Sequence, residues 1–240
     1  KIPTSFNGLK IIQLTDLHYG TTMFNENVKE IVKMTNDRNP DLIVFTGDLI
    51  DKNYKLTNKE QEEIIKELKK LSASLGKYAI IGDEDNEKTN TILNQANFTI
   101  LKNESELIYQ KNNEPILLVG LSSNSKNQNI EKAYSYFKQD VFNSNIYTIT
   151  LLHEPDTVDD IIGSYNSDLF LDGHSNNGNI RLPFVKYSLF KVDGAKKYDQ
   201  DYYNLGNSKL YISSGLGTTN QSNIRLFCRP SINFFRLSNQ

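Results

Sequence analysis

The sequence is poor in several residue types that often carry chemistry. Its 240 residues include no tryptophan, one cysteine and three histidines. A single thiol, Cys228, excludes an internal disulfide and any metal site built from several cysteine thiolates. No run of about 18 apolar residues occurs, so no segment of this chain predicts a transmembrane helix. The chemistry of this chain therefore has to come from carboxylates, amides, hydroxyls and three imidazoles.

Acidic and basic residues nearly cancel. There are 27 basic and 29 acidic side chains, which gives a formal net charge of −2. No basic stripe stands out, so the sequence indicates no nucleic-acid partner. With 38% hydrophobic residues, the chain can bury a substantial core. No linker, repeat or low-complexity tract divides it, and we expect a single domain spanning residues 1–240.

Strand and helix patterns alternate along the chain, which is typical of an α/β protein. Short apolar runs predict strands at Leu9–Thr15, Asp41–Thr46, Lys77–Ile81, Phe98–Leu101, Glu106–Tyr109, Pro115–Gly120, Ile146–Leu152, Ser167–Leu171, Lys209–Ser214 and Ile232–Leu237. Helical spacing predicts helices at Asn25–Asn39, Thr57–Leu75 with Gly76 as its C-cap, Thr89–Gln95, Ile130–Gln139 and Pro155–Ile162, and a turn at Asn112-Asn113 joins two strands. Two packed sheets with helices outside would accommodate this pattern.

Metal-binding side chains gather just beyond the predicted strands. Asp16 and His18 follow the first strand, and Asp48 follows the second. His153 and His174 follow two later strands. Residues i and i+2 of an extended segment point the same way, so Asp16 and His18 can reach one ion. Carboxylates and imidazoles together suit Mn, Fe or Zn, and the strand ends of an open α/β sheet are where such sites form.

Each of these residues also has a plainer structural interpretation. Asp16 and His18 could be a capping aspartate and an exposed histidine, and Gly47-Asp48 could be an ordinary turn. A lone histidine is more often structural than a ligand. Here all three histidines of the chain lie at strand ends beside two aspartates in the same setting, which favours a metal site.

Five motifs follow one another in an order that resembles a known family. They are Asp16-Leu17-His18, Gly47-Asp48-Leu49-Ile50-Asp51, Gly82-Asp83-Glu84-Asp85, His153 and Gly173-His174-Ser175-Asn176. This order resembles the calcineurin-like metallophosphoesterases over nearly the whole chain. The tail is similar to the bacterial membrane-associated branch, in which Gly-His-x-His-Gly-Gly-Gln-Ile-Arg-Leu-Pro precedes Ser-Gly-Leu-Gly and Ile-Arg-Leu-Phe. The corresponding segments here are residues 173–183, 214–217 and 224–227.

The resemblance implies a four-layer α/β/β/α sandwich with two metal ions at the strand ends. It implies a ligand set of Asp16, His18 and Asn176 for the first ion, Asp48 as the bridge, and Asp83, His153 and His174 for the second. The implied reaction is hydrolysis of a phosphate mono- or diester by a metal-bound hydroxide, with the ions stabilising charge on the phosphoryl oxygens. One or two divalent ions are expected per chain, and a single ion would occupy the group of Asp48, Asp83, His153 and His174. Mn is the expected metal, with Fe, Zn or Ca as alternatives.

Three positions, Asp83, Glu84 and Asn176, depart from the family pattern. Where the family has Gly-Asn-His, this chain has Gly82-Asp83-Glu84, so Glu84 replaces the histidine that would contact phosphate and protonate the leaving group. Asn176 replaces a histidine ligand, and its amide oxygen is a weaker, neutral donor. The three aspartates of the ligand set and an ionised Glu84 would contribute about −4 against about +4 from two divalent ions. A neutralised centre attracts anionic phosphate poorly, so we expect weakened catalysis. Glu84 and Asp48 are the catalytic candidates, Glu84 as a general acid if it is protonated.

Three functional hypotheses remain open at this point. The chain is an active phosphohydrolase with an altered site, a degenerate member that binds a metal, a phosphate-bearing ligand or a protein partner without turnover, or a structural domain without metal. We favour the first, with a small phosphate ester or a lipid or cell-envelope component as substrate. The branch it resembles carries an N-terminal membrane segment, which implies a tether outside this chain and an extracytoplasmic location, with the cytoplasm as alternative.

Overall fold

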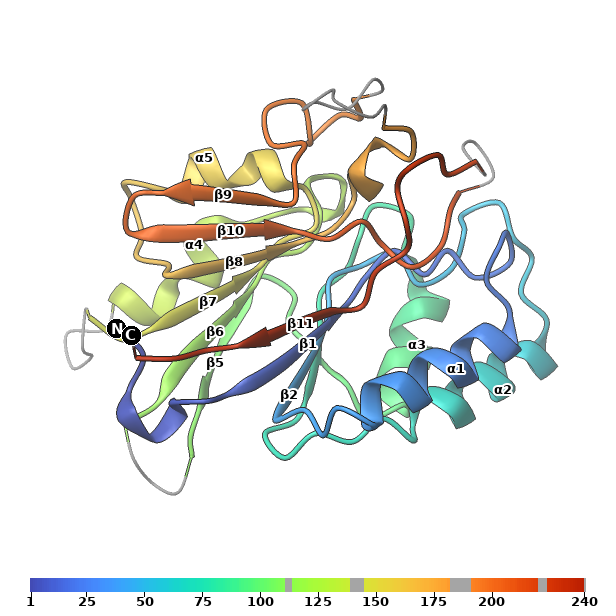
Figure 1. Ribbon diagram of the computed structural model, residues 1–240, viewed down its shortest axis with the longest axis horizontal. Helices are drawn as coiled ribbons and strands as arrows, with labels where there is room; N and C mark the ends of the chain where they lie inside the picture. The colour runs from blue at the N-terminus through green and yellow to red at the C-terminus, as the bar shows by residue number, and fades with distance from the viewer. Residues whose placement is uncertain (111–113, 139–144, 182–190, 220–223, 240) are drawn as a thin grey trace.

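Two β-sheets lie face to face in this computed structural model, and helices cover their outer faces (Figure 1). The structure describes residues 1–110, 114–138, 145–181, 191–219 and 224–239. In Figure 1 the helices α1, α2 and α3 lie together on one side, and α4 and α5 lie on the other. The predicted α/β/β/α sandwich is therefore confirmed.

The first sheet has five strands in the order β11-β1-β2-β3-β4. They are β1 (Lys10–Leu14), β2 (Leu42–Phe45), β3 (Lys77–Ala79), β4 (Thr99–Ile100) and β11 (Asn233–Arg236). The crossovers contain α1 (Asn25–Asn36), α2 (Asn58–Leu68) and α3 (Glu87–Gln95). Strands β1 to β4 are parallel, and the C-terminal β11 pairs antiparallel with β1. The parallel strands therefore direct their carboxyl ends to the same edge of the sheet.

The second sheet has six strands in the order β5-β6-β7-β8-β10-β9. They are β5 (Glu104–Ile108), β6 (Ile116–Gly120), β7 (Thr148–Leu151), β8 (Leu169–Asp172), β9 (Tyr202–Leu205) and β10 (Ser208–Ile212). Strands β6, β7, β8 and β10 are parallel, and both edge strands are antiparallel to their neighbours. The short helices α4 (Ile130–Ala133) and α5 (Val158–Ile161) belong to the crossovers of this sheet.

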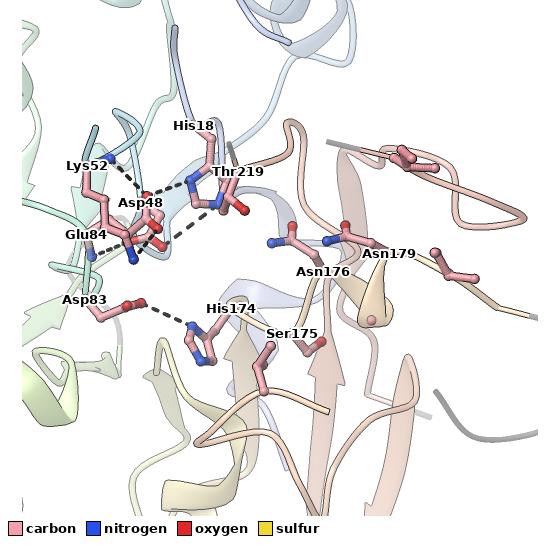
Figure 2. Close-up of a pocket in the computed structure, with 14 residues that line it drawn as sticks. His18, Asp48, Lys52, Asp83, Glu84, His174, Ser175, Asn176, Asn179 and Thr219 are labelled. Carbon is pink, nitrogen blue, oxygen red and sulfur yellow. Dashed lines mark hydrogen bonds and ion pairs between the residues drawn. The ribbon is translucent and has the colours of Figure 1, made fainter. Parts of the chain in front are cut away.

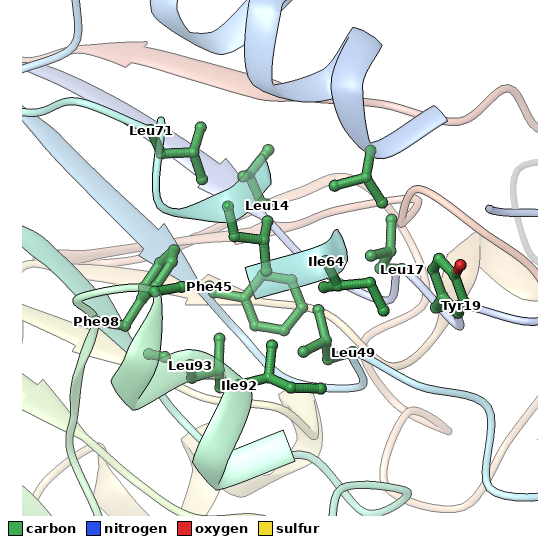
Figure 3. Close-up of a cluster of buried hydrophobic side chains, with 14 of the residues drawn as sticks. Leu14, Leu17, Tyr19, Phe45, Leu49, Ile64, Leu71, Ile92, Leu93 and Phe98 are labelled. Carbon is green, nitrogen blue, oxygen red and sulfur yellow. The ribbon is translucent and has the colours of Figure 1, made fainter. Parts of the chain in front are cut away.

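The apolar strands are buried on both faces, as parallel sheets require. In β2, Leu42 and Val44 pack into the layer between the sheets, whereas Ile43 and Phe45 pack under the helices. Figure 3 shows Phe45 in the helical layer with Ile64 of α2 and residues of α3. Because both faces of these strands are covered, the loops at the strand ends are where charged side chains can reach solvent or a ligand.

Several predicted boundaries differ from the structure. Helix α2 ends at Leu68, and Gly76, with φ +106°, forms the turn before β3, so its assignment as the C-cap was wrong. Thr57 caps α2 through a hydrogen bond from Glu60 N and a reciprocal bond from its own N–H to Glu60, which starts the helix one residue later than predicted. The predicted helix at Ile130–Gln139 is a four-residue α4 followed by a 3₁₀ turn.

Two further sequence assignments concern the second sheet. Strand β9 was not predicted, because its four residues alternate between exposed and half-buried positions at a sheet edge and contain no apolar run. The predicted helix at Pro155–Ile162 is a 3₁₀ turn followed by α5. The predicted turn at Asn112-Asn113 lies outside the described residues.

Candidate metal centre

The loops after the parallel strands carry all the predicted ligands, five of which line one pocket. Asp16 and His18 follow β1, Asp48 follows β2, and Asp83 follows β3 of the same sheet. The second sheet contributes residues that follow β7 and β8, namely His153, His174 and Asn176. Five of these residues have positive φ values, which non-glycine residues rarely adopt: Asp16, His18, Asp48, His174 and Asn176. Backbone strain concentrated in this way is typical of functional sites.

One ligand group combines residues from both sheets. The donor atoms of Asp48, Asp83, His153 and His174 all lie within 4.8 Å of one another. His153 Nε2 lies 3.0 Å from Asp83 Oδ1 and 3.3 Å from Asp48 Oδ2. His174 Nδ1 lies 3.1 Å from the same Asp83 oxygen. Two carboxylates and two imidazoles at this spacing are chemically suited to one divalent cation.

A second group of donors lies beside the first and shares Asp48 with it. Asp16, His18 and Asp48 form this group, and all three side chains are buried. His18 Nε2 lies 3.6 Å from Asp16 Oδ1 and 3.9 Å from Asp48 Oδ2. Because Asp48 belongs to both groups, the two candidate ion positions are adjacent, as in a centre with a bridging carboxylate.

Outer hydrogen bonds hold each imidazole of the first group with one nitrogen toward the centre. His153 Nδ1 lies 2.7 Å from the carbonyl oxygen of Thr46, which leaves Nε2 for Asp48 and Asp83. His174 Nε2 lies 2.7 Å from the carbonyl oxygen of Asp193, which leaves Nδ1. A carbonyl oxygen only accepts, so the bonded nitrogen carries the hydrogen and the other can be a metal ligand.

The Asp16–His18 side of the centre shows donors without partners. Asp16 Oδ2 accepts hydrogen bonds from Thr15 Oγ1 at 2.7 Å and from His174 N at 3.0 Å. Its Oδ1 and both nitrogens of His18 are buried and make no hydrogen bond among the described residues, although the His18 nitrogens lie within ion-pair distance of carboxylates. Buried polar atoms are costly without partners. These atoms therefore fit a bound cation.

The charges at the centre are strongly coupled through space. Burial raises the pKa of Asp48 to about 6, although His153 and His18 counteract it. Burial disfavours a charged His18, but Asp16 and Glu84 outweigh it and raise the pKa of His18 to about 10. Burial alone would raise the pKa of Asp83, but contacts with the imidazoles of His153 and His174 outweigh it and hold this pKa well below its usual range. The carboxylates thus favour a positive charge at His18, which a divalent cation would supply in place of a proton.

Glu84 lies in the same pocket, on the side of His18. Its Oε2 is 3.3 Å from His18 Nδ1 and accepts a hydrogen bond from Lys52 N at 3.1 Å. Its Oε1 is 3.6 Å from Lys52 Nζ (Figure 2). Glu84, His18 and Asp51 form a third group of clustered donors. The sequence-based prediction that Glu84 faces the site is compatible with these contacts, and its catalytic role stays a prediction.

Asn176, the remaining predicted ligand, also lines the pocket but is engaged elsewhere. Its Oδ1 accepts a hydrogen bond from Arg225 Nη2 at 3.2 Å. Its backbone carbonyl accepts from the thiol of Cys228 at 3.2 Å. The side-chain oxygen that would bind a metal is therefore already bonded to a cationic side chain.

Sequence reasoning missed the residues that support the ligands. Asp85, Asp193 and Arg225 each hold a ligand or a ligand loop by hydrogen bonds. Asp85 lies within the Gly82–Asp85 motif, and its place in that motif was the sequence feature that could have indicated its supporting role. Arg225 stands within the segment at residues 224–227 that resembles the family, but its contact with Asn176 joins residues 49 positions apart and had no local signal. Asp193 lies outside every motif, and its contact with His174 joins residues 19 positions apart.

Comparison with known proteins agrees with this geometry. A family model described as calcineurin-like phosphoesterase matches residues 9–189. The uncharacterized metallophosphoesterase YkuE of Bacillus subtilis is 31% identical over 246 residues, covering 98% of this chain and 81% of that protein. The phosphodiesterase YaeI of Escherichia coli is 25% identical over 232 residues, covering 95% of this chain and 82% of that protein.

Solved structures support the fold. The calcineurin-like phosphoesterase YfkN of Bacillus subtilis superposes with a TM-score of 0.51 at 13% identity, covering 87% of this chain and 82% of that one. The Thermus thermophilus protein TT1561 superposes with a TM-score of 0.54, also at 13% identity, covering 87% and 90%. At this identity the likeness concerns the arrangement of sheets and helices alone.

Proposed function

This chain belongs to the calcineurin-like phosphoesterase family, and from that premise we propose that it is a metal-dependent hydrolase of phosphate mono- or diesters. The observation that carries the proposal is the pair of adjacent donor groups that share Asp48. When bound, divalent ions at such a centre lower the pKa of a coordinated water and neutralise charge on phosphoryl oxygens.

The residues of this chain would hold the ions in place and are themselves held in orientation by hydrogen bonds. Asp48, Asp83, His153 and His174 would hold one ion, and Asp16 and His18 together with Asp48 would hold another. The carbonyl oxygens of Thr46 and Asp193 keep two of the imidazoles turned toward the centre. These ligands therefore need little reorientation on binding, which favours affinity and defined geometry.

Glu84 is our candidate for proton transfer to the leaving oxygen. Its carboxylate lines the pocket, and two titratable groups lie beside it, His18 Nδ1 at 3.3 Å and Lys52 Nζ at 3.6 Å. A proton held among these three groups can pass to an alkoxide as the ester bond breaks. The same carboxylate repels an anionic substrate, so we expect slower turnover than at a centre without it.

We propose Mn as the bound metal, with Fe, Zn or Ca as alternatives. The donor set combines three carboxylates with imidazoles and contains no thiolate, which suits such ions. For the substrate, Ile180, Val192 and Ile224 form an apolar part of the pocket lining. This lining supports a phosphate ester that carries an apolar group, as a lipid or cell-envelope component does.

We also propose that the protein is tethered to the membrane and faces the extracytoplasmic side. The proposal rests on the similarity of the tail segments at residues 173–183, 214–217 and 224–227 to the membrane-associated branch. Within the described residues, no helix is long and apolar enough to cross a bilayer. Fractionation of cells that produce the full-length protein tests this, and recovery in the cytoplasmic fraction would contradict it.

The enzymatic proposal is tested by metal analysis and turnover on one sample. Purified, unchelated protein is analysed for metal content and assayed with bis-(p-nitrophenyl) phosphate and added Mn²⁺. We expect bound metal and Mn-dependent turnover that chelation abolishes. An Asp83→Asn/His153→Asn double variant should lose turnover and the ion held by its own donor group, whereas an Asp37→Asn variant at the exposed C-cap of α1 should keep the wild-type metal content and turnover. Metal binding without turnover of any phosphate ester would contradict the proposal.

A non-catalytic binding protein is the second candidate function. It is favoured by the negative charge of Glu84 inside the pocket and by the engagement of Asn176 with Arg225. In that case the centre would retain metal and bind inorganic phosphate, and turnover would be absent in wild-type protein and in Glu84→Gln alike.

A further inference from the structure

Arg225 holds the amide of Asn176 in one orientation. Arg225 Nη2 lies 3.2 Å from Asn176 Oδ1. A guanidinium carries only donors, so the amide oxygen and not the nitrogen has to face it. The amide nitrogen then points away from Arg225, toward the side of the pocket where His18 and Asp48 lie (Figure 2).

The guanidinium is itself fixed by the loop at residues 214–217. Its Nη1 donates to Ser214 O at 2.6 Å, and Nη2 also donates to Gly217 O. This loop is bonded to the first ligand loop, since Gly217 N donates to Asp16 O at 2.7 Å. Asn176 is therefore oriented by a network that is anchored beside the ligand Asp16.

The packing of the amide oxygen supports the same orientation. A Cβ atom placed on Gly215 would lie 2.1 Å from Asn176 Oδ1, so the oxygen rests against the backbone of the loop. Turning the amide to direct this oxygen at an ion would bring its NH₂ group against Arg225. Donor would then face donor, and Arg225 Nε already lacks a hydrogen-bond partner among the described residues. Such a rotation leaves buried donors unsatisfied, which is costly.

We propose that Asn176 is a hydrogen-bond donor to an anionic oxygen of the bound phosphate, and that Arg225 is its positioning residue. An amide NH₂ has two hydrogens to donate and no lone pair for a cation. Asn176 thus replaces the metal ligand expected at this position by a phosphate-binding group. The ion position beside Asp16 and His18 then has three protein ligands, Asp16, His18 and Asp48, instead of four. The assumption that phosphate binds at this centre rests on the proposed function.

Two titrations test this inference without turnover. Full-length wild-type protein and an Asn176→Ala variant are titrated calorimetrically with Mn²⁺, and the Mn-loaded proteins are then titrated with inorganic phosphate. We expect the number of Mn sites and each Kd to stay within twofold, and the phosphate Kd to rise at least fivefold. Asn204→Ala, an exposed asparagine of β9, is the matched control and should leave both titrations unchanged.

Three results would overturn the inference. Loss of a Mn site or a tenfold weaker Mn Kd in Asn176→Ala would make Asn176 a metal ligand. An unchanged phosphate Kd would remove its role as a donor, and so would wild-type protein that binds Mn but no phosphate. Phosphate binding without ester turnover would instead contradict only the proposed function.

A second variant examines the positioning role of Arg225. Arg225→Lys keeps the charge but replaces the planar fork by a single nitrogen, which cannot occupy the positions of both Nη1, bonded to Ser214, and Nη2, bonded to Gly217 and Asn176. We expect its phosphate Kd to rise at least threefold while the unfolding midpoint confirms a folded protein. A folded variant with wild-type phosphate affinity would show that Arg225 does not position Asn176.

Discussion

The carboxylate of Asp85 accepts a hydrogen bond from the backbone N–H of Asp48 at 2.9 Å, although the two residues follow different strands. The same carboxylate accepts from Leu49 N at 3.0 Å and from Gly82 N at 2.8 Å. The loop after β2 carries Asp48 and the loop after β3 carries Asp83, so one buried side chain sets the distance between two ligand loops. The candidate centre depends on residues that never touch a metal.

Asp85→Ala should weaken both the fold and metal binding. It leaves three buried backbone donors without an acceptor, which we expect to lower the free energy of unfolding by about 3 kcal/mol. Because Asp48 belongs to both donor groups, we also expect Mn²⁺ affinity to fall at least tenfold. Urea unfolding of chelated protein and Mn²⁺ calorimetry measure the two effects. Asp37→Ala, an exposed control, should change neither, and a wild-type Mn²⁺ affinity in Asp85→Ala would refute the positioning role.

Glu84→Gln separates the two effects expected of that carboxylate. Removing one negative charge from the pocket should lower the KM for an anionic ester severalfold, because Glu84 no longer repels it. If Glu84 delivers the proton, kcat for an alkyl phosphate ester should fall about tenfold or more. The kcat for a p-nitrophenyl ester should change less, since nitrophenolate leaves without a proton. Steady-state kinetics on both substrates decide the matter, and unchanged kcat for the alkyl ester would eliminate the acid role.

The fold and the clustering of the candidate ligands could be predicted from the sequence because their signals are local. An apolar run that ends in Asp-x-His or Gly-Asp marks both a buried strand and the site at its end, and the sandwich was confirmed. The supporting contacts could not be predicted, because Arg225 meets Asn176 and Asp193 meets His174 only after both sheets have packed. The exposed edge strand β9 had no apolar pattern. The apolar spacing predicted a helix as far as Leu75, whereas α2 ends at Leu68, so the spacing did not mark the end of the helix.

Lys77 should make stability rise with pH in mildly alkaline solution. Burial, with a smaller contribution from Lys69, lowers the pKa of Lys77 to about 8. Its Nζ donates to the carbonyl oxygen of Ala96 at 2.6 Å. An unfolded lysine has a pKa of about 10.4, so between about pH 8 and 10 the unfolded chain binds more protons than the folded one. The free energy of unfolding therefore increases with pH in that window.

Replacement of Lys77 by Met removes this dependence. We expect the free energy of unfolding of wild-type protein, relative to Lys77→Met, to rise by about 1–2 kcal/mol between pH 7.5 and 9.5. Urea unfolding at several pH values measures the difference. Lys66→Met on the exposed face of α2 should run parallel to wild type, and a Lys77→Met curve parallel to wild type would contradict the expected proton release.

Asp172 is a buried carboxyl group at the end of β8, and its replacement should stabilise the metal-free protein. Neither of its side-chain oxygens has a hydrogen-bond partner within the described residues. Burial raises the pKa of Asp172 well above its usual range, so the folded chain holds a proton that the unfolded chain releases near pH 4. This group therefore destabilises the fold increasingly as pH rises from about 4 toward neutrality.

Asp172→Asn keeps the shape and removes the titration. In chelated protein we expect a Tm several degrees above wild type at pH 7, and a difference that shrinks toward pH 4 as the wild-type carboxyl becomes protonated in both states. Asp160→Asn, an exposed carboxyl of α5, serves as control and should leave the Tm unchanged at both pH values. A variant Tm at or below that of wild type at pH 7 would mean that the Asp172 carboxylate is stabilised in the fold, and burial would then not be the dominant influence on it.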